Sequence, residues 1–238
     1  MRLDKLLANM GVGSRKDVKN LIKKKKIQVN GSIAKKPNQM IDPEQDEVIC
    51  NGEQIRYQKY IYLMLHKPKG YISATHDDSQ QTVLDLIDPS DKVLEPFPVG
   101  RLDKDTEGLL LLTNNGQLAH QLLSPKKHVE KAYIAHVDHS VSSKDIELFE
   151  IGIDIGEKEI TRPAKLEILD ETEANKVKVT ISEGKFHQIK RMFHALNNEV
   201  TYLKRISMGS LSLDKSIQLG DYRHLTEDEI EKLKKDGT

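Results

Sequence analysis

The polar segment of residues 100–108 holds the side chains of this sequence that are best placed for chemistry. Arg101 and Asp103 lie close together in it, and the apolar run of residues 109–113 follows directly. A short apolar run between turn residues predicts a strand that is buried on both faces. A loop on such a strand can hold a carboxylate rigidly while water still reaches it, which makes Asp103 a candidate nucleophile or base. Alternatively, Asp103 or Thr106 only accepts hydrogen bonds from backbone N–H groups in a turn.

Two distant segments offer further candidates. Tyr133 lies at the start of a strand predicted over residues 132–137, where its ring could stack on a nucleobase. A tyrosine at such a position can equally serve ordinary packing. Lys190 and Arg191 follow a turn and enter a helix whose apolar residues recur at i, i+3, i+4 and i+7 from Ile189. Both cations are then left to reach a neighbouring site or the solvent.

The charge of the chain is unevenly distributed, although its formal net charge is zero. Residues 1–36 contain eleven Lys or Arg against two acids, a net charge of +9 that the remaining residues balance. A basic head on an acidic body indicates a polyanionic partner, although lysine runs also serve solubility.

Helices and strands around these segments can be read from the same sequence. Helical spacing over residues 3–10 and a Ser14–Asp17 capping box predict two short helices. Asn30–Gly31 and Asn51–Gly52 each indicate a hairpin. Further strands are expected at 61–65, 132–137, 164–169, 176–181 and 200–203, with helices at 117–123, 142–149 and 226–233. This mixed order favours an α+β protein over a regular βαβ repeat.

The catalytic candidates lie in strings that resemble the pseudouridine synthases, in the branch typified by RsuA. The matching strings are GRLDKDTEGLLLLTNNG from residue 100, K-A-Y at 131–133 and H-Q-I-K-R-M at 187–192. The resemblance implies that Asp103 is the essential catalytic residue, that Lys190 pairs with it and that Tyr133 stacks on the target uracil. A lysine at position 190 points to the small-subunit rRNA branch. Contacts to RNA are implied for Arg101, Lys67, Lys131 and Arg191, with an ordinary turn as the alternative for the Lys-Pro segment at 67–70.

The basic head resembles a small RNA-binding domain, the alpha-L motif, first described in a ribosomal protein. The matching strings are R-L-D-K at residues 2–5, G-S-R-K at 13–16 and I-x-V-N-G at 27–31. The resemblance implies phosphate contacts on the second helix and the turn after it, from Arg15, Lys16, Lys19, Lys23 and Lys24 through Lys26. We therefore expect an RNA-binding domain over residues 1–58. A catalytic domain over 59–238 would follow, with a mixed, mainly antiparallel β-sheet and flanking helices.

The two resemblances imply an isomerase that flips one uridine of 16S rRNA, free or in a small-subunit assembly intermediate, and converts it to pseudouridine. Asp103 could act as nucleophile at C1′ or as base at the sugar. A 23S rRNA pseudouridine synthase and a non-catalytic ribosome assembly factor are the alternatives. The single Cys50 and scattered histidines predict no metal, and nothing in the sequence asks for a cofactor. Apolar runs too short for a membrane span and the lack of a visible signal peptide predict a cytoplasmic protein, which we expect to be a monomer.

Overall fold

The computed structural model describes residues 1–170 and 172–237 of the chain. Two compact units are present, Met1–Ile61 with Asp88–Glu95, and Tyr62–Ile87 with Pro96–Thr238. The boundary predicted between residues 58 and 59 falls within the last few residues of the first segment. Among the described residues, no helix is long and apolar enough to cross a membrane.

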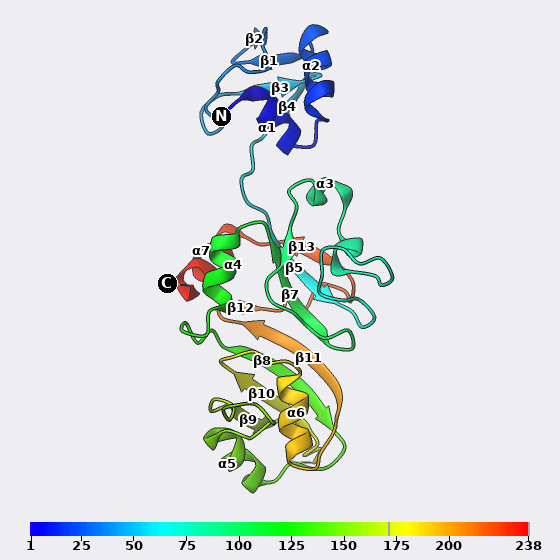
Figure 1. The fold of residues 1–238 in the computed structure, drawn as a ribbon, viewed down its shortest axis with the longest axis vertical. Coiled ribbons are helices and arrows are strands. Elements are labelled where there is room, and N and C mark those ends of the chain that lie inside the picture. Colours follow the sequence, from blue (N-terminus) through cyan, green and yellow to red (C-terminus); the bar gives the residue numbers. More distant parts are fainter. Residues whose placement is uncertain (171, 238) are drawn as a thin grey trace. The chain divides into compact units, whose positions relative to one another are not determined.

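The smaller unit pairs two helices with a four-stranded sheet of order β2-β1-β3-β4 (Figure 1). Its elements are α1 (Leu3–Asn9), α2 (Arg15–Lys23), β1 (Ile27–Val29), β2 (Ser32–Ile33), β3 (Val48–Cys50) and β4 (Glu53–Ile55), and α3 (Pro89–Lys92) groups with them. Both predicted hairpins are confirmed, because Asn30 and Gly31 have φ of 50° and 74° and Asn51 and Gly52 have φ of 53° and 89°. These positive angles belong to the tight turns that match strand twist.

Local signals also explain the helices of this unit. Ser14 accepts a hydrogen bond from the backbone N–H of Asp17, and the Asp17 carboxylate accepts one from the backbone N–H of Ser14. This capping box satisfies donors that would otherwise be unpaired at the start of α2. Apolar side chains of both helices and the sheet then form one core, which includes Leu3, Leu6, Leu7, Val18, Ile22, Ile27 and Val48.

The larger unit is built on a nine-stranded sheet of order β13-β5-β7-β11-β8-β10-β9, with β6 on β7 and β12 on β11. Its strands are β5 (Tyr62–Lys67), β6 (Phe97–Pro98), β7 (Glu107–Thr113), β8 (Lys131–Val137), β9 (Lys165–Ile168), β10 (Lys176–Ile181), β11 (Val200–Met208), β12 (Leu211–Ser212) and β13 (Tyr222–His224). Its helices are η1 (Val83–Leu86), α4 (Gly116–Leu123), α5 (Ser143–Ile151), α6 (Gln188–Ala195) and α7 (Glu227–Asp236). Among the pairs named in this sheet, only β7 and β11 run parallel, so the expected mixed, mainly antiparallel sheet is confirmed.

The parallel pair forms a narrow seam between two halves of the sheet. It joins β7 and β11 at only two positions, Glu107 with Lys204 and Gly108 with Arg205. A Cβ atom on Gly108 would lie 2.1 Å from the carbonyl oxygen of Arg205, and Gly108 has a φ of 108°. Glycine is therefore required for the two backbones to approach this closely. The loop that carries Asp103 ends at this seam.

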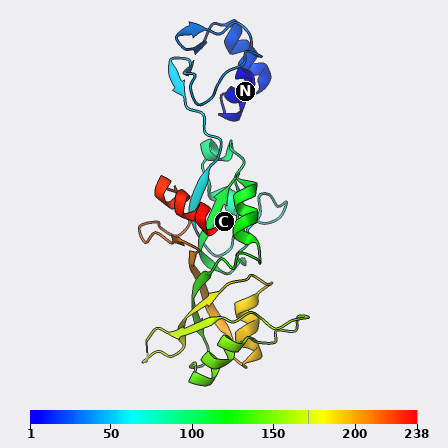
Figure 2. The same ribbon diagram turned by 90° about the vertical axis from the view of Figure 1, so that its left-hand side faces the viewer.

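Helices cover the two halves separately (Figures 1 and 2). Leu118 and Leu122 of α4 and Leu233 of α7 share a core with Met64 of β5 and Leu111 of β7. In the other half, Phe149 of α5 meets Phe193 of α6 with ring centroids 5.0 Å apart. Because α6 is packed in this way, the residues at its N-terminus are held against the sheet near the seam.

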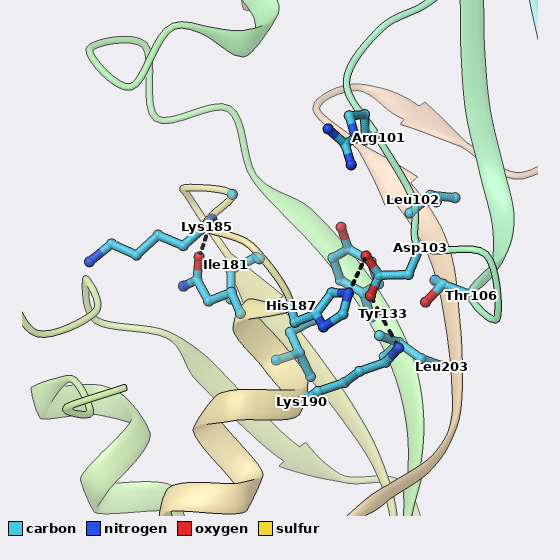
Figure 3. Close-up of a pocket in the computed structure, with 13 residues that line it drawn as sticks. Arg101, Leu102, Asp103, Thr106, Tyr133, Ile181, Lys185, His187, Lys190 and Leu203 are labelled. Carbon is cyan, nitrogen blue, oxygen red and sulfur yellow. Dashed lines mark hydrogen bonds and ion pairs between the residues drawn. The ribbon is translucent and has the colours of Figure 1, made fainter. Parts of the chain in front are cut away.

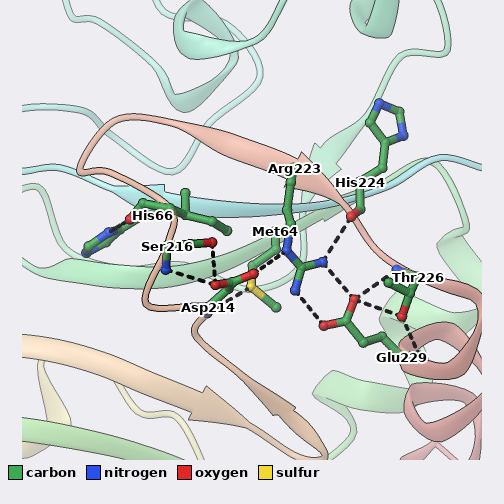
Figure 4. Close-up of polar contacts among 9 residues, drawn as sticks. Met64, His66, Asp214, Ser216, Arg223, His224, Thr226 and Glu229 are labelled. Carbon is green, nitrogen blue, oxygen red and sulfur yellow. Dashed lines mark hydrogen bonds and ion pairs between the residues drawn. The ribbon is translucent and has the colours of Figure 1, made fainter.

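A charged network fixes the C-terminal helix to the sheet edge (Figure 4). Arg223 of β13 donates from Nε to Asp214 at 2.7 Å and from both terminal nitrogens to Glu229 at 2.8 and 2.7 Å. Glu229 is also the third residue of the capping box that Thr226 opens. The predicted final helix is thus confirmed, and it continues beyond residue 233.

Candidate active site

A buried lysine holds the loop before β7, residues 100–106, in place. Lys67 lies at the end of β5 with no exposed surface, and its Nζ donates to the carbonyl oxygens of Pro68, Asp103 and Thr106 at 3.0, 3.0 and 2.9 Å. Burial lowers the pKa of Lys67 to about 8, against the opposing pull of nearby carboxylates led by Asp105. The expectation that Lys67 contacts RNA is therefore wrong, because its ammonium is enclosed by the backbone of the loop.

Neighbouring segments complete this support. The Ser73 hydroxyl donates to the carbonyl oxygen of Leu102 and accepts from its N–H, both at 2.9 Å. The N–H of Gly70 donates to the carbonyl oxygen of Lys104 at 2.8 Å. The backbone on either side of Asp103 is thus fixed by side chains and backbone that lie 29 or more residues away in sequence.

The carboxylate of Asp103 meets Lys190 in space (Figure 3). Lys190 Nζ lies 3.1 Å from Asp103 Oδ2, and His187 Nε2 lies 3.5 Å from Asp103 Oδ1. Only the backbone carbonyl of Asp103 accepts the turn hydrogen bond, which comes from the N–H of Thr106 at 3.0 Å. The turn-cap alternative therefore does not describe this side chain, whose carboxylate is left for a partner at the site.

Lys190 is shared between two carboxylates. Its Nζ also donates to Asp105 Oδ1 at 2.6 Å. Burial opposes the charge of Lys190, but hydrogen bonds to Asp105 and Asp103 outweigh it and raise the pKa of Lys190 above its ordinary value. Burial likewise opposes the charge of Asp105, yet the hydrogen bond from Lys190 lowers the pKa of Asp105. Lys190 and Asp105 are therefore both charged at neutral pH.

Tyr133 lies across the same cavity. It is 7% exposed, and with Asp103, Lys190, Ile189 and Leu203 it lines a cavity of about 90 Å³ (Figure 3). The three residues predicted to act together, Asp103, Tyr133 and Lys190, thus come from a loop, a strand and a helix and converge on one cavity. A carboxylate, a cation and an aromatic ring beside apolar side chains can hold a flat polar base next to a nucleophilic oxygen.

The remaining cations predicted near this site differ in placement. Arg101 is exposed and lines the cavity. Lys131 is 8% exposed, donates to the carbonyl oxygen of Val129 at 2.8 Å and lines an adjoining cavity of about 360 Å³. Arg191 instead bonds to Glu157 at 2.8 Å and to the carbonyl oxygen of Phe186 at 3.1 Å. The guanidinium thus braces the segment around residue 157, and because its side chain is still 28% exposed the expected RNA contact of Arg191 stays a prediction.

The cations predicted in the head lie on α2 or next to it. All are exposed on α2 or at its C-cap: Arg15, Lys16, Lys19, Lys23 and Lys24. Beside them Lys19, Lys23, Lys25 and Lys35 line a groove of about 530 Å³. Within the described residues, no acidic side chain lines this groove. The surface is suited to a chain of phosphates.

The structure adds three residues that the sequence did not single out. Asp105 shares Lys190, His187 lies beside Asp103, and Arg205 is 2% exposed on β11 directly opposite Tyr133 on β8. Asp105 and His187 belong to the strings that carried the resemblance. Their closeness in sequence to Asp103 and Lys190 could therefore have indicated that they lie at the site. Arg205 follows Lys204 in β11, and nothing in the sequence distinguishes it from a surface cation.

Comparison with known proteins assigns the chain to a family. A family model described as RNA pseudouridylate synthase matches residues 61–195, and an S4 domain model matches residues 1–56. The chain belongs to the RNA pseudouridine synthase family. It is 53% identical to "Uncharacterized RNA pseudouridine synthase YtzG" of Bacillus subtilis (strain 168), over 98% of each chain. The basic head of this pseudouridine synthase is accordingly an S4 domain, which confirms the predicted RNA-binding fold.

Relatives with more specific names cover almost the entire synthase. "Ribosomal small subunit pseudouridine synthase A" of Haemophilus influenzae is 42% identical over 99% of this chain and 100% of its own. The protein of the same name in Escherichia coli (strain K12) is 38% identical over 97% and 98%. A crystal structure titled pseudouridylate synthase superposes with a TM-score of 0.69 at 40% identity, covering 98% and 99% of the two chains. Fold and enzyme class of this pseudouridine synthase are thus both supported.

Proposed function

We propose that this pseudouridine synthase isomerises one uridine of 16S rRNA. The observation that carries the proposal is the carboxylate of Asp103, 3.1 Å from Lys190 in a cavity that Tyr133 also lines. Full-length similarity to proteins named for the small ribosomal subunit supports this RNA class over 23S rRNA.

The reaction rearranges one nucleoside without a group donor. The N1–C1′ bond of uridine breaks, the uracil turns in place, a C5–C1′ bond forms, and the proton of C5 leaves while N1 gains one. Because C1′ is hidden in a stacked strand, the nucleotide must be flipped into the cavity first. The Asp103 carboxylate then acts either as nucleophile at C1′ or as base at the sugar.

Each neighbour of Asp103 has a separate role. The Lys190 ammonium stabilises the negative charge of the carboxylate and fixes its orientation. The ring of Tyr133 stacks on the uracil and keeps it in place while it turns. Arg101, exposed beside the cavity, holds a backbone phosphate or occupies the space that the flipped base leaves.

The S4 domain supplies affinity. Cations on α2 contact RNA phosphates and orient the substrate without reading its sequence. The protein acts as a monomer in the cytoplasm, where rRNA is transcribed and assembled. Sedimentation of the purified protein would test the first point against its mass of 27.1 kDa, and cell fractionation would test the second.

Release of tritium from RNA labelled at uracil C5 tests the enzymatic proposal. Wild-type protein should release the label from 16S rRNA, and Asp103→Asn should not. Asp105→Asn is the comparison variant, since it removes a carboxylate of the same loop that also binds Lys190 but is 69% exposed. Asp105→Asn should retain more activity than Asp103→Asn. Equal release by Asp103→Asn and wild type would contradict the role of Asp103.

Mapping of pseudouridine in cells with and without the gene tests the substrate. One site in 16S rRNA should disappear without the gene. A site lost from 23S rRNA would favour a large-subunit enzyme. Loss of no site, together with retained RNA binding, would favour a non-catalytic assembly factor.

A further inference from the structure

Two buried cations lie together next to the catalytic cavity. Lys131 on β8 and Arg205 on β11 are 8% and 2% exposed. Arg205 pairs across the strands with Tyr133, and Lys131 precedes Tyr133 by two residues on β8, so all three project from one face of the sheet. Both cations line the cavity of about 360 Å³ that adjoins Asp103 and Tyr133.

These cations are short of partners within the described part of the chain. Arg205 Nε donates to the carbonyl oxygen of Leu109 at 2.8 Å, while its buried Nη2 has no hydrogen-bond partner. Lys131 Nζ donates only to the carbonyl oxygen of Val129. An ammonium group has three donors and a guanidinium five, so capacity remains on both side chains.

In the part of the chain that the structure describes, Lys131 and Arg205 also lack a carboxylate that would balance their charge. Burial, and then the charge of Arg205, lower the pKa of Lys131 to about 8, and no carboxylate opposes this shift. Among the described residues that line the cavity, Asp103 is the only acid, and Lys190 already binds it. Lys67 has no exposed surface, but its ammonium has three carbonyl oxygens within 3.0 Å. The protein itself thus supplies acceptors for the ammonium of Lys67. Lys131 and Arg205, in contrast, keep donors without an acceptor in the described structure.

A buried pair of like charges costs stability unless something offsets it. An anion that enters the cavity would satisfy the free donors and remove the repulsion in one step. RNA brings such an anion wherever it brings a uridine. A phosphate also presents several acceptor oxygens to a planar guanidinium and a neighbouring ammonium.

We propose that Lys131 and Arg205 form a phosphate subsite that takes the RNA backbone next to the flipped uridine. This proposal rests on the proposed function only insofar as RNA is the substrate. In the subsite the phosphate fixes the sugar, and the sugar in turn places C1′ beside the Asp103 carboxylate. Lys131 and Arg205 are thus positioning residues. Their contact is available on any RNA sequence, since it involves the backbone alone.

Binding of small ligands to the full-length protein tests the subsite without turnover. Uridine, uridine 5′-monophosphate, uridine 3′-monophosphate and inorganic phosphate would be titrated by calorimetry. At least one monophosphate should bind wild-type protein roughly tenfold or more tightly than uridine, as expected for a charge-assisted contact. The tighter of the two monophosphates identifies the side of the nucleoside whose phosphate enters the subsite.

Variants then locate the effect. Lys131→Gln keeps a donor for the Val129 carbonyl but removes the charge, and it should abolish the preference for the monophosphate. Arg205→Lys keeps the charge but removes Nη2, and it should weaken that preference. Lys178→Gln is the matched control, because Lys178 is half-buried on β10, where its side chain alternates with Val177 and Val179, which are fully buried. It should leave the preference unchanged.

Three results would overturn the subsite: equal binding of uridine and both monophosphates by wild type, a preference that survives in Lys131→Gln, or an equal loss in Lys178→Gln. The thermal midpoint of each variant without ligand shows whether it is folded. Absence of pseudouridine from 16S rRNA would contradict the proposed function but leave these titrations readable. Conversely, failure of the titrations would leave the tritium assay unaffected.

Discussion

At the scale of single residues, the site depends on one lysine that serves two acids. Lys190 lies 3.1 Å from Asp103 and 2.6 Å from Asp105, and its side chain is 23% exposed. Asp103 has 26% of its side chain exposed and Asp105 has 69%. The more enclosed carboxylate faces Tyr133 and the cavity, whereas the more open one holds the lysine from the outside. Position therefore distinguishes two acids of the same type in one loop.

Replacement of Lys190 tests this arrangement. Lys190→Met should lower the rate of isomerisation roughly a hundredfold or more, since it removes a fixed charge from the reacting carboxylate. Lys190→Arg should recover much of the rate, because it retains the charge. Single-turnover tritium release measures both rates, and thermal unfolding checks that the variants fold. A rate for Lys190→Met close to that of wild type would show that the lysine only packs.

At the scale of elements, the catalytic loop is positioned by the end of β5. Lys67 binds carbonyl oxygens on both sides of the loop, and Gly108 brings β7 against β11. The carboxylate of Asp103 is therefore fixed by backbone contacts as well as by its own ion pair. A buried ammonium is a strong brace here, because one charged group donates to three carbonyl oxygens at once.

Removal of this brace should be costly. Lys67→Met should lower the free energy of unfolding by roughly 3 kcal/mol, the usual order for a broken buried polar network. Activity should fall as well, even at temperatures where the variant remains folded, because the loop loses its support. Urea unfolding and tritium release measure the two effects. A variant with full stability and full activity would contradict the role of Lys67.

The buried lysine of β8 predicts a pH dependence of stability. The pKa of Lys131 is about 8 in the folded protein, against an ordinary value of 10.5 in the unfolded chain, so between these values the unfolded chain binds more protons. The free energy of unfolding therefore rises with pH across this window. Relative to Lys131→Gln, wild-type protein should gain up to about 3 kcal/mol between pH 7 and pH 10.5. Urea unfolding at several pH values measures this gain, and parallel curves for the two proteins would show that Lys131 does not titrate in this window.

At the scale of the whole molecule, affinity and chemistry belong to different units. The S4 domain matches residues 1–56, and the synthase domain matches residues 61–195. Exposed cations cover α2 in the first unit, and residues 1–36 carry a net charge of +9 that the rest of the chain balances. Electrostatic attraction to RNA is therefore expected mainly from the S4 domain.

Deletion of residues 1–58 tests this division. RNA binding should weaken, and the plot of log affinity against log salt concentration should become flatter, because fewer phosphates are neutralised. Filter binding at several salt concentrations measures the slope. The full-length variant with Lys16, Lys19 and Lys23 changed to Gln is a control that leaves the fold complete, and its slope should fall as well. An unchanged slope in both proteins would remove the S4 domain from the binding model.

Much of this architecture was predictable from sequence because its signals are local. Turn residues such as Asn30 and Gly31 determine their own hairpin, and capping boxes at Ser14 and Thr226 mark helix starts wherever the rest of the chain lies. Short strands such as β6, β12 and β13 escaped prediction, because two or three residues carry no periodicity. The grouping of Asp103, Tyr133 and Lys190 followed from resemblance, and no spacing rule along the chain would have given it.

By itself, the sequence determined most of the longer helices and strands, the concentration of positive charge in residues 1–36 and the carboxylate that is the catalytic candidate. Tertiary structure alone decided which lysines are buried and what their ammonium groups contact. Lys67 and Lys131 look like surface residues in sequence, yet one is enclosed by carbonyl oxygens and the other lies beside Arg205. The physical reason is that burial and charge depend on which distant segments pack around a side chain. These segments, here β5, the loop before β7, β8 and β11, meet only once the sheet has formed.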